Sequence, residues 1–471
     1  KKSSQQALEG RIGARIGSFG TFGQNLSAQG KINQWNYQFS GSNEKSDGIS
    51  AALGENFDKD GFEKQNANAT VGYSTQNFNV NVNAGYQHHY YDFDNGAFED
   101  GKYKGNDTQK FSGLNAQYSY EKGNITFNSR ISANERIVRN LNNNTYQDQY
   151  SYQGQNIFAE LYNQTQFSEH INLVTGIQYE TQNLGSKSLP WGGTSMQNVL
   201  TLGETEIRNF DVFANANLAY QIFHLDLGAR LNNHSKYDNH FVYSVNPFIL
   251  TDLDDNFLKI GYSYATAFIA PTLYQSYGSL PYVLPNFDLK PESNASHELD
   301  FSFGKKDRTF VVNASVFSRK EKDVFVYNWD NRKFLNVESN KVKGVELGVQ
   351  YHFNEKVNVG GNFSFAEKDN PATRLRSPKQ RANAFLEILP IKNNRINISY
   401  QYTSKRNDAY YDSSSFSTKN VELEAFHLFN LNINQKITKS LDTYLNVGNV
   451  LNTSYTDVIG YTTKPRNITL G

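Results

Sequence analysis

Apolar residues alternate with Asn, Ser or Gln along most of this chain, and residues 78–84 show the pattern most clearly. In that segment every second side chain is apolar, and each residue between is asparagine. Successive side chains of a strand point to opposite faces of a sheet, so the segment has one apolar and one polar face. The pattern recurs along 471 residues without a helical domain. A sheet that is apolar outside, polar inside and closed on itself is the form in which strands cross a bilayer.

The composition restricts the classes of partner. The formal net charge is zero, whereas nucleic-acid binding requires a basic surface, so we expect no nucleic-acid partner. Mean hydropathy is −0.66, and no run approaches the roughly 18 apolar residues of a membrane helix. Because only alternate residues of a barrel strand face lipid, low hydropathy is compatible with a membrane location.

Aromatic residues make up 14% of the chain, with 30 Tyr and 33 Phe. This excess of Tyr suits girdles at the two membrane surfaces, where the ring contacts lipid and the hydroxyl contacts water. Ordinary strand propensity is the alternative explanation. The chain has no cysteine, which excludes disulfides and cysteine-ligated metals. Lys1 is followed by polar residues without a signal-peptide pattern, so we expect a mature chain or a fragment.

Turn residues divide the chain into about 22 candidate strands, within the size range of membrane barrels. Clear strands are 212–220, 225–231, 345–353, 396–402 and 421–433. Tight turns are expected at 76–77, 121–124, 221–223, 354–356 and 392–394. Long loops alternate with them, near 44–63, 89–108, 183–204, 268–293, 321–338, 404–420 and 452–464.

This alternation predicts a single all-β domain over residues 1–471, an up-and-down antiparallel transmembrane barrel of 22 strands. Its short turns would be periplasmic and its long loops extracellular. An even strand count places both chain ends at the short-turn end, so residues 465–471 should pair with a first strand near 8–17. A spanning strand needs about 9–11 residues. The last strand has about seven, so we expect a few C-terminal residues to be missing.

Motifs in the second half of the chain resemble those of TonB-dependent outer-membrane receptors. Residues 267–273 (Ala-Phe-Ile-Ala-Pro-Thr-Leu) and 286–292 (Asn-Phe-Asp-Leu-Lys-Pro-Glu) are similar to the paired boxes of that family. The family's later motifs are matched by Glu298, a Gly-x-Glu strand start at 344–347, and a closing signature at 449–452, Tyr455 and 460–466. The resemblance covers the second half well and the first half loosely.

The resemblance implies energy-coupled uptake of a bulky, scarce nutrient across the outer membrane of a Gram-negative bacterium. In the family a globular plug fills the barrel lumen and contacts a TonB-type energy transducer. The first strand begins near Leu8, so we expect the plug to be absent from this chain. A wide barrel without its plug would be an open pore. Outer-membrane lipid, a small-molecule ligand and a surface lipoprotein that caps the receptor complete the expected partners.

Aromatic residues in the predicted loops are the candidate ligand contacts. Four prolines in the long loop 268–293 exclude a central strand there, because proline cannot donate to a sheet ladder. For these prolines and for Glu298 we expect a structural role. The candidate ligand-facing residues, chosen by loop position, are Tyr90, Tyr91, Trp191, Tyr274, Tyr277, Tyr282, Trp329, Tyr410 and Tyr411.

A calcium site is the one metal site that the sequence suggests. Asp58 and Asp60 lie in an Asp-x-Asp-Gly segment similar to the calcium-holding hairpin of the cobalamin receptor subfamily. Asp92 and Asp94, one hairpin later, would converge on the same ion. Calcium prefers six to eight oxygen ligands, several of them carboxylates. Asp and Gly are also common turn formers, which is the alternative explanation. No cofactor is otherwise required.

The favoured ligand is a corrinoid such as cobalamin. Haem receptors of the family carry an extracellular His between the paired boxes, and residues 272–285 contain none. His88 and His89 are adjacent on a strand and should point to opposite faces, so joint ligation is not expected. A ferric siderophore is the second candidate. A passive porin and a secreted β-rich adhesin are the alternatives from other classes.

We do not expect an enzyme. The sequence has no Gly-x-Ser-x-Gly elbow, His-Glu-x-x-His helix or phosphate-binding loop. A Ser-His-Asp site needs three groups within hydrogen-bond reach. The nine histidines are scattered, and His297 and His427 fall in predicted strands, where packing or a lumen-facing position explains them.

Overall fold

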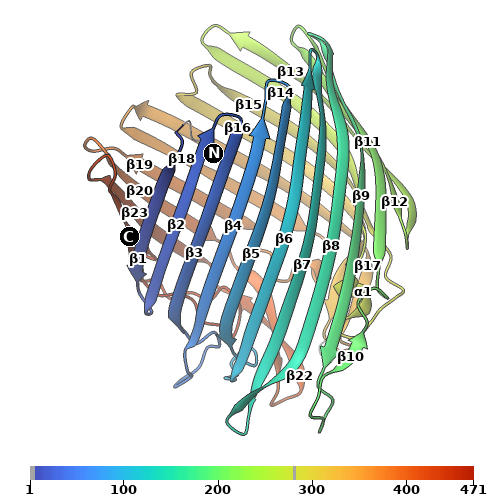
Figure 1. Cartoon of the computed structure of the whole chain (residues 1–471), viewed down its shortest axis with the longest axis vertical. Helices are drawn as coiled ribbons and strands as arrows, with labels where there is room; N and C mark the ends of the chain where they lie inside the picture. The colour runs from blue at the N-terminus through green and yellow to red at the C-terminus, as the bar shows by residue number, and fades with distance from the viewer. Residues whose placement is uncertain (1–5, 279–282) are drawn as a thin grey trace.

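The computed structural model describes residues 6–278 and 283–471, and in these residues 22 strands close into one antiparallel barrel (Figure 1). Each barrel strand pairs with its neighbours in chain order. The first eleven barrel strands are β1 (Glu9–Gly17), β2 (Thr21–Ile32), β3 (Trp35–Ile49), β4 (Asp60–Ser74), β5 (Phe78–Phe93), β6 (Tyr103–Tyr120), β7 (Gly123–Asn142), β8 (Thr145–Ser168), β9 (Ile171–Ser188), β11 (Ile207–Tyr220) and β12 (Phe223–His234).

The second half of the barrel contains β13 (Asp238–Leu253), β14 (Asn256–Ile269), β15 (Glu292–Lys305), β16 (Phe310–Asn328), β17 (Lys333–Asn354), β18 (Val357–Lys368), β19 (Gln380–Ile388), β20 (Asn394–Thr403), β23 (Phe426–Lys436), β24 (Asp442–Gly448) and β25 (Asn467–Leu470). The loops carry the short strand β10 (Gln197–Leu200), the hairpin β21 (Arg406–Asp412) and β22 (Ser417–Leu423), the helix α1 (Leu273–Tyr277) and the 3₁₀ turn η1 (Pro371–Thr373). No helix in the described ranges is long and apolar enough to cross a membrane.

Strand alternation produces an apolar outer face and a polar lumen. On β17, Leu347 and Val349 point outward and are 47% exposed, whereas Glu346 and Gln350 point into the lumen. On β5, Phe78 and Tyr86 both point outward and lie eight residues apart on one strand. With strands rising about 3.3 Å per residue and tilted by about 40°, these two aromatic levels are about 20 Å apart in height. That spacing suits two aromatic girdles around an apolar band.

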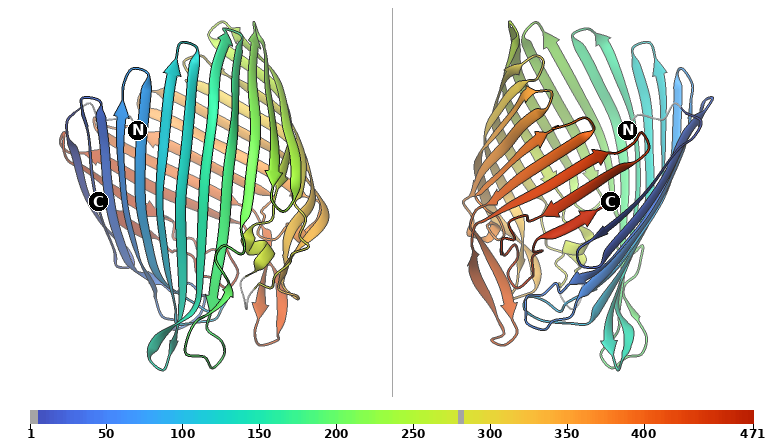
Figure 2. Two further views of the ribbon diagram at one scale, coloured as in Figure 1. Left: turned by 45° about the vertical axis from the view of Figure 1, so that its right-hand side comes forward. Right: turned by 90° about the vertical axis from the view of Figure 1, so that its left-hand side faces the viewer.

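Short turns occupy one end of the barrel and long loops the other (Figure 2). Connections at the short-turn end have two to five residues, such as 121–122 between β6 and β7. At the other end, the loops 189–206, 270–291, 404–425 and 449–466 carry the additional elements or pack against each other. The predicted alternation is therefore present for the seven long connections after β3, β5, β9, β14, β18, β20 and β24. Four other connections at the same end, 18–20, 143–144, 235–237 and 329–332, are short turns.

Two predictions of local structure were wrong. The segment 321–338 is no loop but the end of the β16–β17 hairpin, which turns at 329–332. Its Val, Phe and Tyr residues pair across the ladder and continue the two strands beyond their neighbours. The run 421–433 is two strands, because β22 ends at Leu423 and β23 begins at Phe426. The loop hairpin β21–β22 thus stands apart from the barrel sheet.

The first and last strands close the barrel over a short ladder. In the described residues, β25 pairs with β1 at two positions, Ile16 with Leu470 and Gly17 with Thr469. The backbone N–H of Ser18 also donates to the carbonyl of Ile468 at 2.8 Å. Figure 2 shows the two ends of the sheet facing each other on the same side of the barrel.

Candidate functional site

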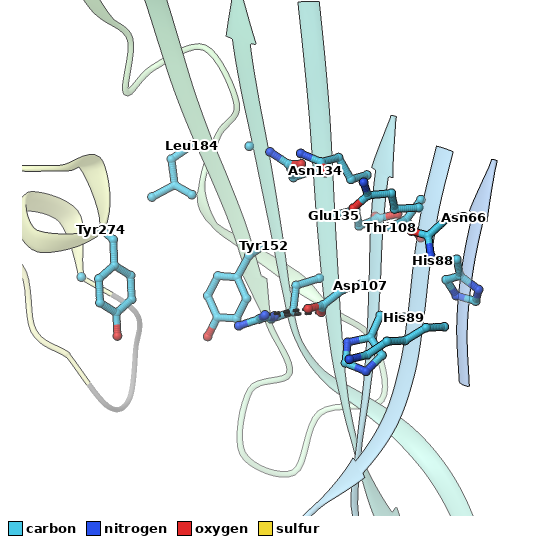
Figure 3. A pocket seen from close by; sticks show the side chains of 16 residues that line it. Asn66, His88, His89, Asp107, Thr108, Asn134, Glu135, Tyr152, Leu184 and Tyr274 are labelled. Carbon is cyan, nitrogen blue, oxygen red and sulfur yellow. Dashed lines mark hydrogen bonds and ion pairs between the residues drawn. The ribbon is translucent and has the colours of Figure 1, made fainter. Parts of the chain in front are cut away.

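A pocket of about 710 Å³ lies on the lumen wall at the long-loop end (Figure 3). Strands β4 to β8 form its wall, and Tyr274 of α1 faces Tyr152 across it. Most of the remaining lining is polar, with lysine, arginine, histidine, aspartate and amide side chains, and Leu184 of β9 adds an apolar contact. The pocket therefore offers both ring surfaces and hydrogen-bonding groups to a ligand that enters the lumen.

Strand register brings the lining residues into two rows. In the first row, Lys64, His89, Asp107, Arg136 and Tyr152 are consecutive ladder partners on five adjacent strands. Side chains at directly opposed positions share a face of the sheet, so all five point into the lumen. One row nearer the short-turn end, a second row runs across the same strands: Asn66, Gln87, Gln109, Asn134 and Gly154.

The first row carries a paired and an unpaired cation. Arg136 donates from Nε to Asp107 Oδ1 at 2.8 Å and from Nη2 to Oδ2 at 2.6 Å, a bidentate pair. Lys64 Nζ lies 5.0 Å from the ring centre of Phe62, and within the described residues it forms no ion pair. The row thus presents one unpaired positive charge beside a neutralised guanidinium.

Aromatic rings continue the wall toward the loops. His89 lies 4.6 Å from Tyr91 between ring centres, and Tyr91 lies 5.7 Å from Phe93. The Tyr91 ring covers Gly105, where an added Cβ would come within 2.2 Å of the ring. Glycine at that position lets the ring lie flat on the sheet.

The helix α1 is short and closed at both ends. Thr272 accepts the N–H of Gln275 at 3.1 Å, and the Gln275 side chain accepts the N–H of Thr272 at 2.9 Å, which is a capping box. Gly278, at φ 76°, ends the helix and donates its N–H to the Tyr274 carbonyl at 2.9 Å. This turn fixes Tyr274 over the pocket.

The predicted aromatic contacts are distributed over several places. Tyr274 lines the pocket and Tyr91 adjoins it, whereas Tyr90 lies on the outer face, 5.3 Å from Lys104 Nζ. Tyr282 lies outside the described residues. The others are in the loops: Trp191 fully exposed, Tyr277 against Phe287, Trp329 against Tyr327, Tyr410 against Phe98, and Tyr411 exposed.

The two adjacent histidines separate as strand geometry requires. His89 joins the lumen row, while His88 points outward and hydrogen-bonds through Nε2 to Asn106 Oδ1 at 2.6 Å. The sequence reasoning named neither Lys64, Asp107, Arg136 nor Tyr152. Their alternate positions marked them as lumen-facing, but only the register between strands places them in one row.

A cluster of carboxylates lies in the loops above β3 to β6. Asp58, Asp94 and Asp100 bring oxygen atoms within 4.8 Å of one another, and Asp60, beside them, accepts the backbone N–H of Ala51 at 2.6 Å. Asp92 does not join them. It lies on the outward face of β5 and forms an ion pair with Lys104 at 3.1 Å, so Asp100 takes the position that the sequence assigned to Asp92.

Burial and hydrogen bonding have opposite effects on the pKa values of the carboxyl groups in this cluster. A strand needs about 9–11 residues to span the bilayer. Asp60 is 14 residues from Ser74, the short-turn end of β4, which places it beyond that band. Burial raises the pKa of Asp60 to about 7; the N–H of Ala51 lowers it, and the Asp94 and Asp58 carboxylates raise it. Burial opposes ionisation of Asp94 too, but N–H donors from Ala52 and Gly101 lower its pKa. Asp60 is therefore the carboxyl group of this pair that takes up a proton first as the pH falls.

The same cluster is tied to the last long loop. The Gly460 carbonyl accepts N–H groups from Leu53 at 2.8 Å and from Phe98 at 3.0 Å. Thr462 donates its hydroxyl to the Ser50 carbonyl. The loop 449–466 is thus fixed against the loops 50–59 and 94–102.

Arg406 fixes the loop hairpin to the same last loop. Its side chain is 2% exposed, and Nη2 donates to the Thr456 carbonyl at 3.0 Å and to Asp457 Oδ1 at 2.9 Å. The buried Asp408 accepts the N–H of Ile459 at 2.8 Å and binds Arg376 at 2.7 Å. Five connections, 50–59, 94–102, 369–379, 404–425 and 449–466, therefore form one packed layer over part of the barrel mouth.

Comparison with known proteins identifies the fold family. The family described as TonB dependent receptor-like, beta-barrel, matches residues 13–450. The vitamin B12 transporter BtuB of Vibrio cholerae is 24% identical over 283 residues, which cover 57% of this chain. The match covers 44% of that transporter, so this chain aligns with less than half the length of the curated relative.

Solved structures share the complete barrel. The ferric enterobactin receptor PfeA superposes with a TM-score of 0.81 at 14% identity, covering 100% of this chain and 81% of that one. The copper transporter OprC gives a TM-score of 0.80 at 15% identity, with 100% and 81% covered. At these identities the likeness concerns the fold. Together with the family match over residues 13–450, it shows that the chain belongs to the TonB-dependent receptor-like β-barrel family, whose members are receptors and transporters.

Proposed function

We propose that the chain is the barrel of an outer-membrane receptor that imports a bulky nutrient, with the long loops extracellular and the short turns periplasmic. The observation that carries the proposal is the lumen pocket walled by the row from Lys64 to Tyr152 and covered by Tyr274. A ligand captured at the loops reaches this pocket from the outside. A plug domain of the family's kind would close the lumen below it, and a TonB-type transducer would supply the energy for release.

The favoured ligand is a corrinoid. A corrinoid carries several peripheral amides around a large ring and little net charge. The amide row of the pocket (Asn66, Gln87, Gln109 and Asn134) offers both donors and acceptors to such groups. The rings of Tyr152 and Tyr274 offer apolar faces. The match to a vitamin B12 transporter supports the same choice.

A ferric siderophore is the second candidate, because Lys64 supplies an unpaired cation in the pocket. An anionic metal chelate would use that charge and would displace Asp107 from Arg136. Structural neighbours named as siderophore receptors support this alternative. Replacing Lys64 by Gln separates the two ligands, since it should weaken an anionic chelate strongly and a neutral corrinoid little.

Titration of the full-length receptor in detergent tests the choice directly. We expect cyanocobalamin to bind at micromolar concentration or tighter by isothermal calorimetry, and ferric enterobactin to produce no heat above dilution. Absence of cyanocobalamin binding at 100 µM would overturn the corrinoid assignment. Steady, ungated conductance of the full-length protein in planar bilayers would instead indicate a passive porin.

We also propose that the carboxylate cluster binds calcium. Asp58, Asp94 and Asp100 fit the ion, since their oxygens lie within 4.8 Å of one another and calcium prefers carboxylate oxygens. The ion would offset the part of the pKa rise at Asp60 that comes from the Asp94 and Asp58 carboxylates. Calcium at 1 mM should raise the melting temperature, and EDTA should reverse the rise. Asp58→Asn, at an exposed position, should remove most of the effect; an unchanged calcium response would contradict the site.

A further inference from the structure

Four lysines gather on the outward face of the β16–β17 hairpin: Lys320, Lys322, Lys341 and Lys343, here called the outward lysine cluster. All four side chains are exposed, whereas the intervening Val342 is 3% exposed and Asn340 is 2% exposed. Strand alternation places the lysines on the same face as Val316 and Leu347, which belong to the apolar outer surface. The cluster therefore points away from the lumen.

The four positive charges of the cluster outnumber the two carboxylates that lie opposite them, Glu367 and Asp369. Lys320 lies directly opposite Lys341 on the ladder, and like charges in that relation destabilise a sheet. No lysine of the cluster forms an ion pair in the part of the chain that the structure describes. Glu367, opposite Lys343, is held by Lys379 at 2.6 Å. Asp369, opposite Lys341, accepts a backbone N–H through Oδ1 at 2.6 Å.

An apolar hollow of about 380 Å³ begins at Lys343 on the same outer surface. It lies between β14 and β18. The side chains that line it on this face are Tyr262, His297, Leu299, Val316, Ser318, Val345 and Phe365. The Tyr262 hydroxyl and His297 Nδ1 are hydrogen-bonded at 2.7 Å. The surface thus has an apolar groove with a cationic rim.

The height of the cluster matches the membrane boundary. Lys343 is 11 residues from Asn354, the short-turn end of β17, and Lys320 is 10 residues from Phe310 at the same end of β16. A spanning strand takes about 9–11 residues. The lysines therefore lie where the hydrocarbon ends and the headgroups begin, with the hollow just inside the hydrocarbon.

We propose that this surface binds a phosphorylated, acylated lipid of the outer leaflet. An acyl chain fills the hollow, and a phosphate lies among Lys320, Lys341 and Lys343. Charge-assisted contacts to one dianionic group relieve the repulsion between Lys320 and Lys341. The inference rests on the orientation in the proposed function, which places this end of the barrel at the outer leaflet.

The probe is diphosphoryl lipid A, added to the detergent-solubilised protein and followed by native mass spectrometry. The variant K320Q/K341Q/K343Q should lower the lipid-bound fraction at least tenfold. The matched control K356Q/K392Q/K439Q removes the same charge from exposed lysines in the short turns and should leave binding unchanged. Heat-modifiability on gels checks that each variant retains the folded barrel.

A second binding experiment uses lipid A from which both phosphates have been removed. The native protein should bind it at least tenfold more weakly than the diphosphoryl form. Equal binding of the two lipids, or equal loss in both triple variants, would overturn the proposal. Cyanocobalamin titration of the same variants keeps the two proposals apart, because the lysines lie on the outer face and should not alter ligand affinity.

Discussion

The backbone N–H of Ala52 donates to Asp94 Oδ2 at 2.6 Å and joins the loop after β3 to the loop after β5. Asp94 Oδ1 accepts the N–H of Gly101 at 3.1 Å, so this one carboxylate holds two loops. The Gly460 carbonyl adds the last long loop to the same layer. The carboxylate cluster is therefore part of the structure that covers the barrel mouth.

Asp94→Asn should loosen that layer. The amide keeps the size of the side chain but replaces one acceptor oxygen by a donor that faces the Ala52 or Gly101 N–H. Losing a charge-assisted hydrogen bond costs about 1.5–3 kcal/mol. We expect faster trypsin cleavage at Lys59 or Lys102, read by mass spectrometry. Asp92→Asn, on the outer face, should leave the cleavage rate unchanged; equal acceleration in both would contradict the loop contacts.

The calcium response should depend on pH through Asp60. Its folded pKa of about 7 lies above the ordinary value of 3.8, so protonation stabilises the folded loops and this contribution is lost as pH rises through 7. Without calcium, the melting temperature should fall between pH 6 and pH 8. With calcium, which competes with the proton, affinity should rise over the same interval. Asp60→Asn should flatten both curves, and a persistent slope in that variant would assign the effect to another group.

Neighbouring tyrosines on β5 provide a test of the pocket. Tyr91 packs against His89 at 4.6 Å on the lumen face, while Tyr90 points outward beneath Lys104. Tyr91→Ala should weaken ligand binding about tenfold. The reason is that a flat ring of a ligand gains about 1–3 kcal/mol by stacking on an aromatic side chain. Tyr90→Ala should leave binding within twofold. A larger loss in the Tyr90 variant would place the ligand outside the lumen.

Two arginine–aspartate pairs on β7 offer a matched comparison. Arg136 pairs with Asp107 in the lumen row, and Arg139 pairs with Asp148 at 2.7 Å on the outer face. Arg136→Ala leaves an unpaired carboxylate in the pocket and should lower ligand affinity about tenfold by calorimetry. Arg139→Ala makes the same chemical change away from the lumen. Identical affinities in the two variants would exclude the first row from the ligand site.

The barrel itself was predictable because its signals are local. Alternation, turn residues and loop lengths lie within single hairpins and do not require long-range information. The β16–β17 hairpin differs from the predicted loop. Residues 328–333, polar except for Trp329, are typical of a loop, although the apolar residues 324–327 have strand character. Outside the bilayer, the length of a strand depends on how far its backbone continues to pair with the neighbouring strand. The alternation of lipid-facing residues carries no information about that length.

The sites were predictable only in part. Phe78 points outward, and every second residue after it on β5 does the same. This rule places Tyr90 and Asp92 on the outer face and Tyr91 in the lumen, so the sequence contained this separation. The row from Lys64 to Tyr152 could not be predicted from the sequence, because its members meet only when five strands pair in the correct register. Asp100 lies in the carboxylate cluster because of how the loops pack, and loop packing leaves no periodic pattern in the sequence.

The orientation of the strand faces underlies every proposal, and adjacent residues on β17 test it. The chain has no cysteine, so single cysteines at Leu347 and Glu346 can carry a bimane label in liposomes. Brominated acyl chains should quench the label at 347 and leave that at 346 bright, whereas iodide in water should do the reverse. Equal quenching at both positions, or the opposite assignment, would contradict a barrel with an apolar exterior and a water-filled lumen.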